Sequence, residues 1–397
     1  MAEAQREVWI TGVGVVSTLG EGPQAHWQKL MEGRAGADET TFAPYVVHPL
    51  APVNFDTQIP KKGDQRQMEP WQRIGTYAAG LALDSAGVKG KTEILSHMDM
   101  IVAAGAGERD IAADSGILSG LPQAQNQAAY LNERLMSDLR PTLFLAQLSN
   151  LLAGNISIVH GVTGSSRTFM GEEAAGVDAV RIAYARIASG QSDIALVGGS
   201  FNGERPDVIL LYEFGHFVLK DRYKPVWERR DNPGFVPGSL GAFLVIEARD
   251  YAEKRGAKPL ARLSAVISER TRRAPGSIAA ALAGLWDKIK PKLRSGHVAA
   301  LSGATGTEPA TGEEREFLAA HGDLAVRATG SYFGHGMDSQ FPMNVALAAI
   351  AVAHGSLFPP HDATGLERPM SGELHQVLVT SVGHWRGEGL ALVERIE

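Results

Sequence analysis

The chain has 397 residues, enough for two or three domains or for one large duplicated unit. Its 38 Lys and Arg against 44 Asp and Glu give a formal net charge of −6, which argues against a nucleic-acid partner. The sequence contains no cysteine, so disulfides, cysteine-ligated metals and thiolate nucleophiles are all excluded.

The sequence shows no targeting segment. Residues 1–7 lack the apolar stretch of a secretory signal. The longest apolar run, residues 345–353, is far shorter than the roughly 20 residues of a membrane-spanning helix. Walker, HExxH and GxSxG motifs are also missing, so we expect no bound nucleotide and no metal site. These observations predict a cytoplasmic protein without a membrane span.

Predicted strands and helices alternate along the first half of the chain. Residues 8–11 predict a short buried strand, and Gly12 and Gly14 after it predict a tight turn. The pattern then predicts a helix at 71–86, a strand at 98–104, a helix at 174–189, a strand at 194–197 and a turn at Gly198 and Gly199. A helix followed by a strand is typical of a parallel α/β sheet.

The second half repeats this order. We expect a strand at 260–267, a helix at 278–289, a strand at 298–301, a helix at 341–354 and two final strands at 377–380 and 390–395 around a glycine-rich loop. We therefore divide the chain into two similar halves, residues 1–247 and 248–397. Two irregular stretches rich in proline or charge, residues 38–64 and 204–237, are expected over the rim of a site or interface.

Several segments carry a family resemblance. Residues 6–20, 231–241 and 251–257, together with Gly334-His335-Gly336, resemble the β-ketoacyl-acyl-carrier-protein synthases, and the likeness spans nearly the whole chain. The resemblance implies the thiolase-like α/β fold, in which two similar halves form a five-layered αβαβα arrangement. It also implies a dimer of fatty acid or polyketide synthesis, in which a cysteine holds the acyl chain and two histidines assist decarboxylation of malonyl carrier protein.

The position of the family's nucleophile carries a carboxylate here. Residues 161–176 match the family pattern without gaps, and the cysteine position falls on Glu173. A thiolate at a helix N-terminus is stabilised by the helix dipole, and a carboxylate gains the same stabilisation without useful nucleophilicity. Without the resemblance, Glu172 and Glu173 are an acidic first helical turn. Arg386 is a candidate ionic partner for Glu173.

The two histidine motifs are only partly retained. By the resemblance, Gly303 replaces the first catalytic histidine, and His335 retains the second. Thr305 and Thr307 match the threonines that bind the pantetheine arm, although β-branched residues in a turn are an equally simple interpretation. The family's lysine falls on Gly330.

The glycine-rich gate loop of the family is replaced by residues 382–387, and the resemblance makes Val382 a substrate-binding candidate. The side chains of His384, Trp385 and Arg386 are larger and more polar than those they replace. We expect them either to plug the site or to contact a partner.

These features favour a homologue that is inactive in condensation and pairs with an active ketosynthase, as chain-length factors do. The working form would be a heterodimer or a homodimer, with residues 106–148 at the interface. Its other partner would be acyl carrier protein, whose phosphopantetheine arm carries the substrate, with no cofactor bound to this chain. The alternative is a divergent synthase or malonyl-carrier-protein decarboxylase that uses His335 with Glu173 as acid or base, its pKa raised by burial. A carrier-protein scaffold is a third possibility, so the sequence leaves enzymatic activity open.

Overall fold

The computed structural model describes residues 5–105, 107–139 and 143–396. In these residues one mixed, eleven-stranded sheet has the order β4-β3-β5-β6-β1-β7-β11-β10-β8-β9, with β2 paired to β1. The strands are β1 (Val8–Ser17), β2 (Gly20–Glu21), β3 (Asp99–Ala103), β4 (Ser166–Phe169), β5 (Ile194–Phe201), β6 (Leu240–Ala248), β7 (Ala261–Glu269), β8 (Val298–Ser302), β9 (Ala325–Ala328), β10 (Gln376–Val382) and β11 (Glu388–Glu394).

The two halves of the sheet have the same pairing pattern when read outward from the centre. β1 pairs antiparallel with β6, β6 antiparallel with β5, and β5 and β4 lie parallel to β3. In the same way β7 and β10 pair antiparallel with β11, and β10 and β9 lie parallel to β8. The expected boundary between residues 247 and 248 falls at the end of β6, and the division into two halves there stays a prediction.

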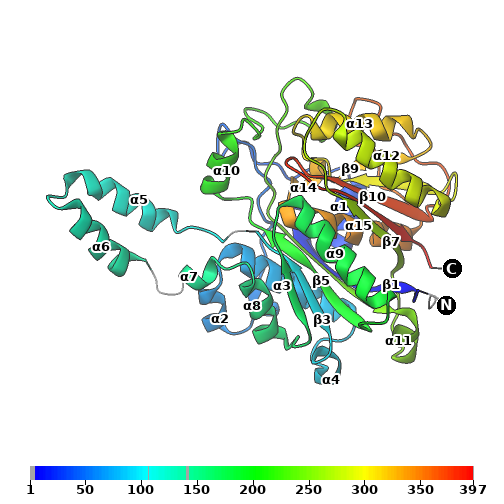
Figure 1. The fold of residues 1–397 in the computed structure, drawn as a ribbon, viewed down its shortest axis with the longest axis horizontal. Coiled ribbons are helices and arrows are strands. Elements are labelled where there is room, and N and C mark those ends of the chain that lie inside the picture. The colour runs from blue at the N-terminus through cyan, green and yellow to red at the C-terminus, as the bar shows by residue number, and fades with distance from the viewer. Residues whose placement is uncertain (1–4, 106, 140–142, 397) are drawn as a thin grey trace.

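Helices fill the space between and outside the two halves of the sheet. Helices α9 (Glu173–Ala188) and α15 (Gln340–His354) contribute to a central core with residues from both halves. Helices α3 (Pro70–Ser85) and α8 (Leu151–His160) cover the outer face of one half, and α12 (Ser277–Ile289) and α13 (Ala310–Ala320) cover that of the other. The result is the five-layered αβαβα stack expected from the sequence (Figure 1).

Further helices surround these layers, and the first of them contributes Leu30 to the central core. They are α1 (Gly22–Met31), α2 (Lys62–Gln67), α4 (Thr92–Leu95), α5 (Ile111–Gly120), α6 (Gln127–Asp138), α7 (Leu143–Ala146), α10 (Pro206–Glu213), α11 (Arg249–Lys254) and α14 (Gly330–Phe333). Helices α5 and α6 form an arm that extends away from the layered body (Figure 1). Among the described helices none is long and apolar enough to cross a membrane.

The turn predicted at Gly12 and Gly14 is wrong, because β1 continues through both residues to Ser17. The glycines serve a close helix contact instead: a Cβ atom on Gly14 would lie 2.0 Å from the backbone oxygen of Ala78 in α3. The turn predicted at Gly198 and Gly199 is wrong for a related reason, since β5 continues to Phe201. A Cβ on Gly198 would lie 2.1 Å from the backbone oxygen of Ala242 in β6.

The two irregular stretches lie against each other. Residues 38–64 contain α2 and a 3-10 turn, Phe55–Thr57, and residues 204–237 contain α10. Tyr45 bridges to Lys220, and His48 bridges to Gly238 just beyond the second stretch. The second stretch reaches the large cavity described below, as expected, through residues at the start of and along α10. The final glycine-rich loop is shorter than predicted, because the flanking strands reduce it to residues 383–387.

Candidate functional site

Glu173 begins the central helix α9 after a strained connection from β4. Gly171 has φ +132°, and Glu172 has φ +58° and ψ −138°, a backbone region that favours glycine and costs roughly 1–3 kcal/mol. The chain holds this conformation because β4 is fixed in the sheet and α9 is packed between the layers. A Cβ on Gly176 would lie 2.3 Å from the backbone oxygen of Asp338, so α9 also lies directly against residues 337–339. The start of α9 is thus fixed from both sides.

Glu173 is held by two histidines. Its side chain is only 2% exposed, and its Oε1 atom accepts a hydrogen bond from His335 Nε2 at 2.8 Å and from His384 Nδ1 at 2.9 Å. Burial acts to raise the pKa of Glu173, but the nearby His384 charge and both hydrogen bonds outweigh it and hold the pKa well below its usual range. Glu173 is therefore a carboxylate, and the interpretation in which burial keeps it neutral is wrong.

His384 belongs to the replaced gate loop and is buried against Glu173. Burial alone would lower the pKa of His384, but the Glu173 charge and hydrogen bond raise it above 6.5. His384 is therefore buried beside Glu173, and whether the loop plugs the site or contacts a partner stays a prediction. Among the described residues, Arg386 makes no hydrogen bond or ion pair with Glu173, so the predicted partner is wrong; its charge acts on Glu172 instead.

Two further carboxyl groups lie beside Glu173. Glu172 accepts a hydrogen bond from the Tyr212 hydroxyl at 2.9 Å, and burial followed by the charge of Glu173 raises the pKa of Glu172. Asp338 is buried, and burial together with the charges of Glu173 and Glu172 raises its pKa to about 8. Sequence reasoning missed Asp338 and Tyr212 as site residues. For Asp338 the sequence offers one signal, its position three residues after the retained histidine His335.

Gly303 leaves no side chain in place of the family's first histidine. The atoms nearest to a Cβ at this position belong to Thr380, Asn344 and Gln340, at 3.1, 3.3 and 3.5 Å. Gln340 and Asn344 are buried polar residues of α15, and Gln340 Oε1 accepts a hydrogen bond from the backbone of Gly336 at 2.9 Å. No catalytic proton donor is supplied from this position.

Thr305 and Thr307 lie close together but are covered. Each is 1% exposed, and their hydroxyl groups share a hydrogen bond of 2.7 Å. Gly306 between them accepts a backbone hydrogen bond from Gly234 at 2.8 Å, so residues of the 204–237 stretch cover this loop. Val382 is also buried, at the end of β10, and the three residues do not line the large cavity. A pantetheine arm would reach the threonines only after this cover moves.

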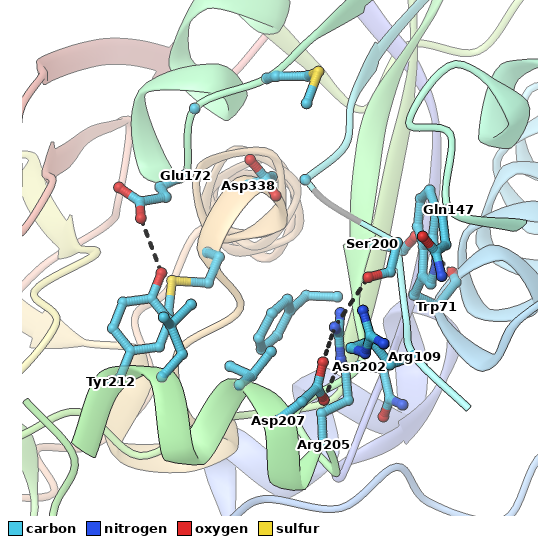
Figure 2. A pocket seen from close by; sticks show the side chains of 18 of the residues that line it. Trp71, Arg109, Gln147, Glu172, Ser200, Asn202, Arg205, Asp207, Tyr212 and Asp338 are labelled. Atoms are coloured by element: carbon cyan, nitrogen blue, oxygen red, sulfur yellow. Dashed lines mark hydrogen bonds and ion pairs between the residues drawn. The ribbon is translucent and has the colours of Figure 1, made fainter. Parts of the chain in front are cut away.

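A cavity of about 900 Å³ opens beside the Glu173 cluster. Figure 2 shows Glu172, Tyr212 and Asp338 on one side of it and Trp71, Arg109 and Arg205 on the other. Arg205 pairs with Asp207 at 2.6 Å and also donates to the backbone oxygen of Gly107. Trp385 and Arg386 of the gate loop line the cavity as well. The cavity is therefore lined by two carboxyl groups and a tyrosine at the end where α9 begins, and by Trp71 and two arginines on the opposite side.

Comparison with known proteins decides the family. Residues 5–252 match the N-terminal domain of β-ketoacyl synthases. The chain belongs to the β-ketoacyl synthase family. It is 24% identical over 266 residues to the 3-oxoacyl-[acyl-carrier-protein] synthase 2 of Vibrio cholerae, a match of 64% of this chain and 61% of that protein. The match covers about three fifths of the length of this relative and of the similar synthases.

Relatives from polyketide synthesis have similar levels of sequence identity. The chain is 30% identical over 264 residues to the tetracenomycin polyketide synthase ketoacyl synthase beta subunit of Streptomyces glaucescens, covering 64% of this chain and 61% of that protein. A Streptomyces coelicolor protein named for actinorhodin polyketide synthesis as β-ketoacyl synthase 2 is 27% identical, with 98% of both chains covered. The chain is thus a homologue of proteins of fatty acid and polyketide synthesis.

Solved structures confirm the thiolase-like fold. The ishigamide ketosynthase/chain length factor matches with a TM-score of 0.81 at 19% identity, covering 99% of this chain and 100% of that chain. A type II polyketide acyl-carrier protein in complex with its ketosynthase matches with a TM-score of 0.76 at 18% identity, over 99% and 100% of the two chains. At such low identity the comparison shows a shared fold, and the shared fold covers 99% of this chain.

Proposed function

We propose that this chain does not condense acyl groups and acts as a chain-length-factor-like partner of an active ketosynthase. The observation that carries the proposal is the Glu173 carboxylate, buried at the start of α9 and bound by His335 and His384. By the ungapped match to the family pattern, Glu173 stands at the position of the acyl-bearing cysteine. A carboxylate provides no thiolate for a thioester, so the acyl chain has no covalent attachment point here.

The surroundings of Glu173 also oppose decarboxylation. His335 Nε2 donates to Glu173, so the atom that would stabilise a thioester enolate is already engaged. Gly303 supplies no second donor. An ionised Glu173 about 4 Å from a malonyl carboxylate would cost on the order of 4 kcal/mol at an effective dielectric near 20. These features support an inactive site.

A partner role is supported by apolar surface on one group of elements. Met136 of the α5–α6 arm, Phe144 of α7, and Leu211 and Phe214 of the α10 region are between 64% and 80% exposed. Strand β4 is the last strand of the sheet order and pairs only with β3 in the described part of the chain. Exposed apolar side chains and an open sheet edge are typical of a subunit interface. Ala106 and residues 140–142 of the expected interface segment lie outside the described residues.

The partner would perform the chemistry with acyl carrier protein. Names of the relatives support this division: one is a ketoacyl synthase beta subunit, and one solved structure is a ketosynthase/chain length factor. Because Thr305 and Thr307 are covered, we propose that the phosphopantetheine arm is delivered to the active subunit. A cytoplasmic location is part of the same proposal.

Coexpression tests the partner role. The chain, carrying an affinity tag, is produced together with an untagged ketosynthase that retains its cysteine and both histidines. We expect the two to purify in equal amounts and to make β-ketoacyl product with malonyl carrier protein, while the tagged chain alone makes none. Condensation by the chain alone, or a homodimer that excludes such a ketosynthase, contradicts the proposal.

The alternative is a malonyl-carrier-protein decarboxylase, in which His335 would exchange its 2.8 Å hydrogen bond to Glu173 for one to the thioester carbonyl. Release of labelled carbon dioxide from malonyl carrier protein by the purified chain, abolished in His335→Ala, would support the decarboxylase. We expect no release above the background given by the variant.

A further inference from the structure

A groove of about 740 Å³ lies near the C-terminal end of α9 and shares no lining residue with the cavity beside Glu172. The second half of α9, the end of β7 and the end of α12 form its walls. Four cationic side chains line it, and none of the described residues that line it is acidic. These four are Arg167, Arg181, Arg186 and Lys288. We call this feature the basic groove.

Two of the four cations have no acidic partner in the described part of the chain. Arg167 donates only to Ser165 Oγ, at 3.4 Å, and Lys288 forms no ion pair there. Both residues are exposed. The chain as a whole has a net charge of −6, so the groove has the opposite sign to the molecule that carries it. A local positive field of this kind attracts anionic groups to one place on the surface.

The other two cations have acidic partners, but these partners do not neutralise the groove. Arg186 pairs with the buried Asp99 at 2.7 Å. Arg181 lies 3.2 Å from Asp178, but the same carboxylate lies 3.1 Å from Arg270. One carboxylate thus serves two guanidinium groups. The groove therefore retains an excess of positive charge after these ion pairs are formed.

Apolar side chains also line the groove. They are Ile182, Val266 and Ile267, of which Val266 is buried. A free inorganic anion needs only the cations, whereas a peptide segment also has carbon atoms of its backbone and side chains to bury against such a surface. The mixed lining therefore favours a peptide with acidic side chains.

The basic groove adjoins the open edge of the sheet. Arg167 belongs to β4, the last strand of the sheet order, and it pairs with Ile101 of β3 on the inner side of that strand. On its other side β4 offers unpaired backbone groups in the described structure. A partner strand that adds to this edge would run past Arg167 and bring its side chains to the groove.

A second copy of this chain fits this edge poorly. Two copies that meet through the same edge contact each other with the same surface patch, so a twofold pair would bring two basic grooves to one interface. Like charges that face each other across an interface oppose association, and complementary charges favour it. The edge therefore suits a partner whose matching surface is acidic.

We propose that the basic groove binds an acidic segment of a different subunit, which runs alongside β4 and places carboxylates on Arg167, Arg181 and Lys288. This inference rests on the partner role proposed above and adds the chemistry of the partner's surface. Guanidinium groups bind carboxylates through paired hydrogen bonds, which fix the orientation of the partner as well as balance its charge. The groove thereby favours a heterodimer over a homodimer.

Binding of an acidic peptide to the purified full-length chain tests the groove. A fluorescein-labelled deca-glutamate peptide is titrated with the chain, and fluorescence anisotropy reports binding. We expect saturable binding of one peptide per chain. The affinity should fall at least tenfold between about 50 mM and about 500 mM NaCl, because salt screens exposed charges. A deca-serine peptide should not bind.

Charge reversal locates the binding. Arg167→Glu and Lys288→Glu should each weaken the affinity at least threefold, and the double variant at least tenfold. Both residues are exposed, so the variants keep the fold, which thermal unfolding checks. Arg249→Glu is the matched control, since Arg249 is also exposed and lines a cavity, but Glu7 and Glu253 line that cavity too. This variant should bind the peptide as wild type does.

Absence of saturable binding, or an affinity that the double variant leaves unchanged, overturns the proposal. Binding of tripolyphosphate in place of the glutamate peptide also overturns it, because the groove would then be a site for phosphate groups. In the pair coexpressed with a ketosynthase, the double variant should weaken association at least tenfold by sedimentation, and association as tight as in wild type contradicts the inference. Failure of any ketosynthase to pair contradicts the proposed function but leaves the peptide result unchanged, so the two failures are distinguishable.

Discussion

Glu173 organises its surroundings because a buried charge requires partners. Its Oε1 atom takes hydrogen bonds from histidines 162 and 211 positions away, so one carboxylate connects α9 to the loop after α14 and to the gate loop. The same charge raises the pKa of its neighbours Glu172 and Asp338, after the effect of burial. A single residue therefore sets both the geometry and the electrostatics of the site.

Removing His384 should destabilise the fold. In His384→Ala the carboxylate of Glu173 keeps only His335, and loss of one partner of a buried pair costs roughly 3 kcal/mol or more. Urea denaturation measures the loss. His375→Ala, at a partly exposed ring, should change the free energy of unfolding by less than about 0.5 kcal/mol. Equal stability of His384→Ala and wild type would contradict the role assigned to the pair.

Glu314 should make stability fall with rising pH. Burial raises its pKa to about 7, although it accepts hydrogen bonds from Thr380 and Ser302. The unfolded chain releases this proton near pH 4.5 and the folded chain keeps it to about pH 7, so stability is lost across that window.

Replacing Glu314 by Gln removes this loss. We expect Glu314→Gln to gain on the order of 3 kcal/mol relative to wild type between pH 4.5 and pH 8, because a pKa difference of one unit corresponds to about 1.4 kcal/mol. Thermal or urea unfolding across this range measures the gain. Glu316→Gln, exposed on the same helix, should follow the wild-type curve. A constant difference between Glu314→Gln and wild type would contradict the raised pKa.

At the scale of elements, the contact between β1 and α3 depends on two glycines. A Cβ on Gly12 or Gly14 would lie 2.4 or 2.0 Å from backbone oxygens of α3. Backbone atoms of a packed helix cannot move aside as a flexible side chain does. The helix can lie this close to the strand only because both positions lack side chains.

Gly14→Val should therefore disrupt the fold, with a loss of more than 3 kcal/mol or insoluble protein. Gly63→Ala is the matched control, since nothing lies within 4 Å of a Cβ at Gly63 in α2. Alanine there should be neutral or stabilise the protein by up to about 1 kcal/mol, because glycine is a poor helix former. Soluble yield and thermal unfolding measure both variants. A Gly14→Val protein as stable as wild type would contradict this argument, because it would show that α3 can move away from β1 without loss of stability.

Helices could be predicted from the sequence where the spacing of apolar residues along the helix itself determines them. The helices expected at 71–86 and 174–189 lie at Pro70–Ser85 and Glu173–Ala188, because apolar periodicity and terminal glycines are local signals. Glycines in β1 and β5 were misread as turns, because their role depends on the neighbouring helix or strand. In the site, the resemblance indicated Glu173 and His335. The contact of His384 with Glu173 spans 211 positions, and no sequence pattern signals it.

At the scale of the whole molecule, exposed apolar side chains on α6, α7 and the α10 region support the association with another subunit proposed above. Phe144 of α7 is 71% exposed, and Phe214, directly after α10, is 80% exposed. Large exposed apolar side chains are unfavourable in water and are typical of a surface that a partner buries. The sheet edge at β4 adds unpaired backbone groups on the last strand of the sheet order.

Phe144→Asp and Phe214→Asp should each weaken subunit association at least tenfold without unfolding the chain, since both side chains are exposed in the single chain. Sedimentation of the purified coexpressed pair measures the effect. Met31→Asp is the control, because Met31 is an exposed apolar residue of α1 outside the arm and α10. If the Met31 variant dissociates and the two phenylalanine variants do not, the interface lies elsewhere.

The central position of β1 sets the order in which the protein can be assembled on the ribosome. β1 is synthesised long before its neighbours β6 and β7, which begin only at Leu240 and Ala261. The nascent chain must therefore carry an unpaired apolar strand while most of the first half is translated. A chaperone that shields residues 8–17 during this interval would raise the yield of native protein, and ribosomal pausing before residue 240 would lower it.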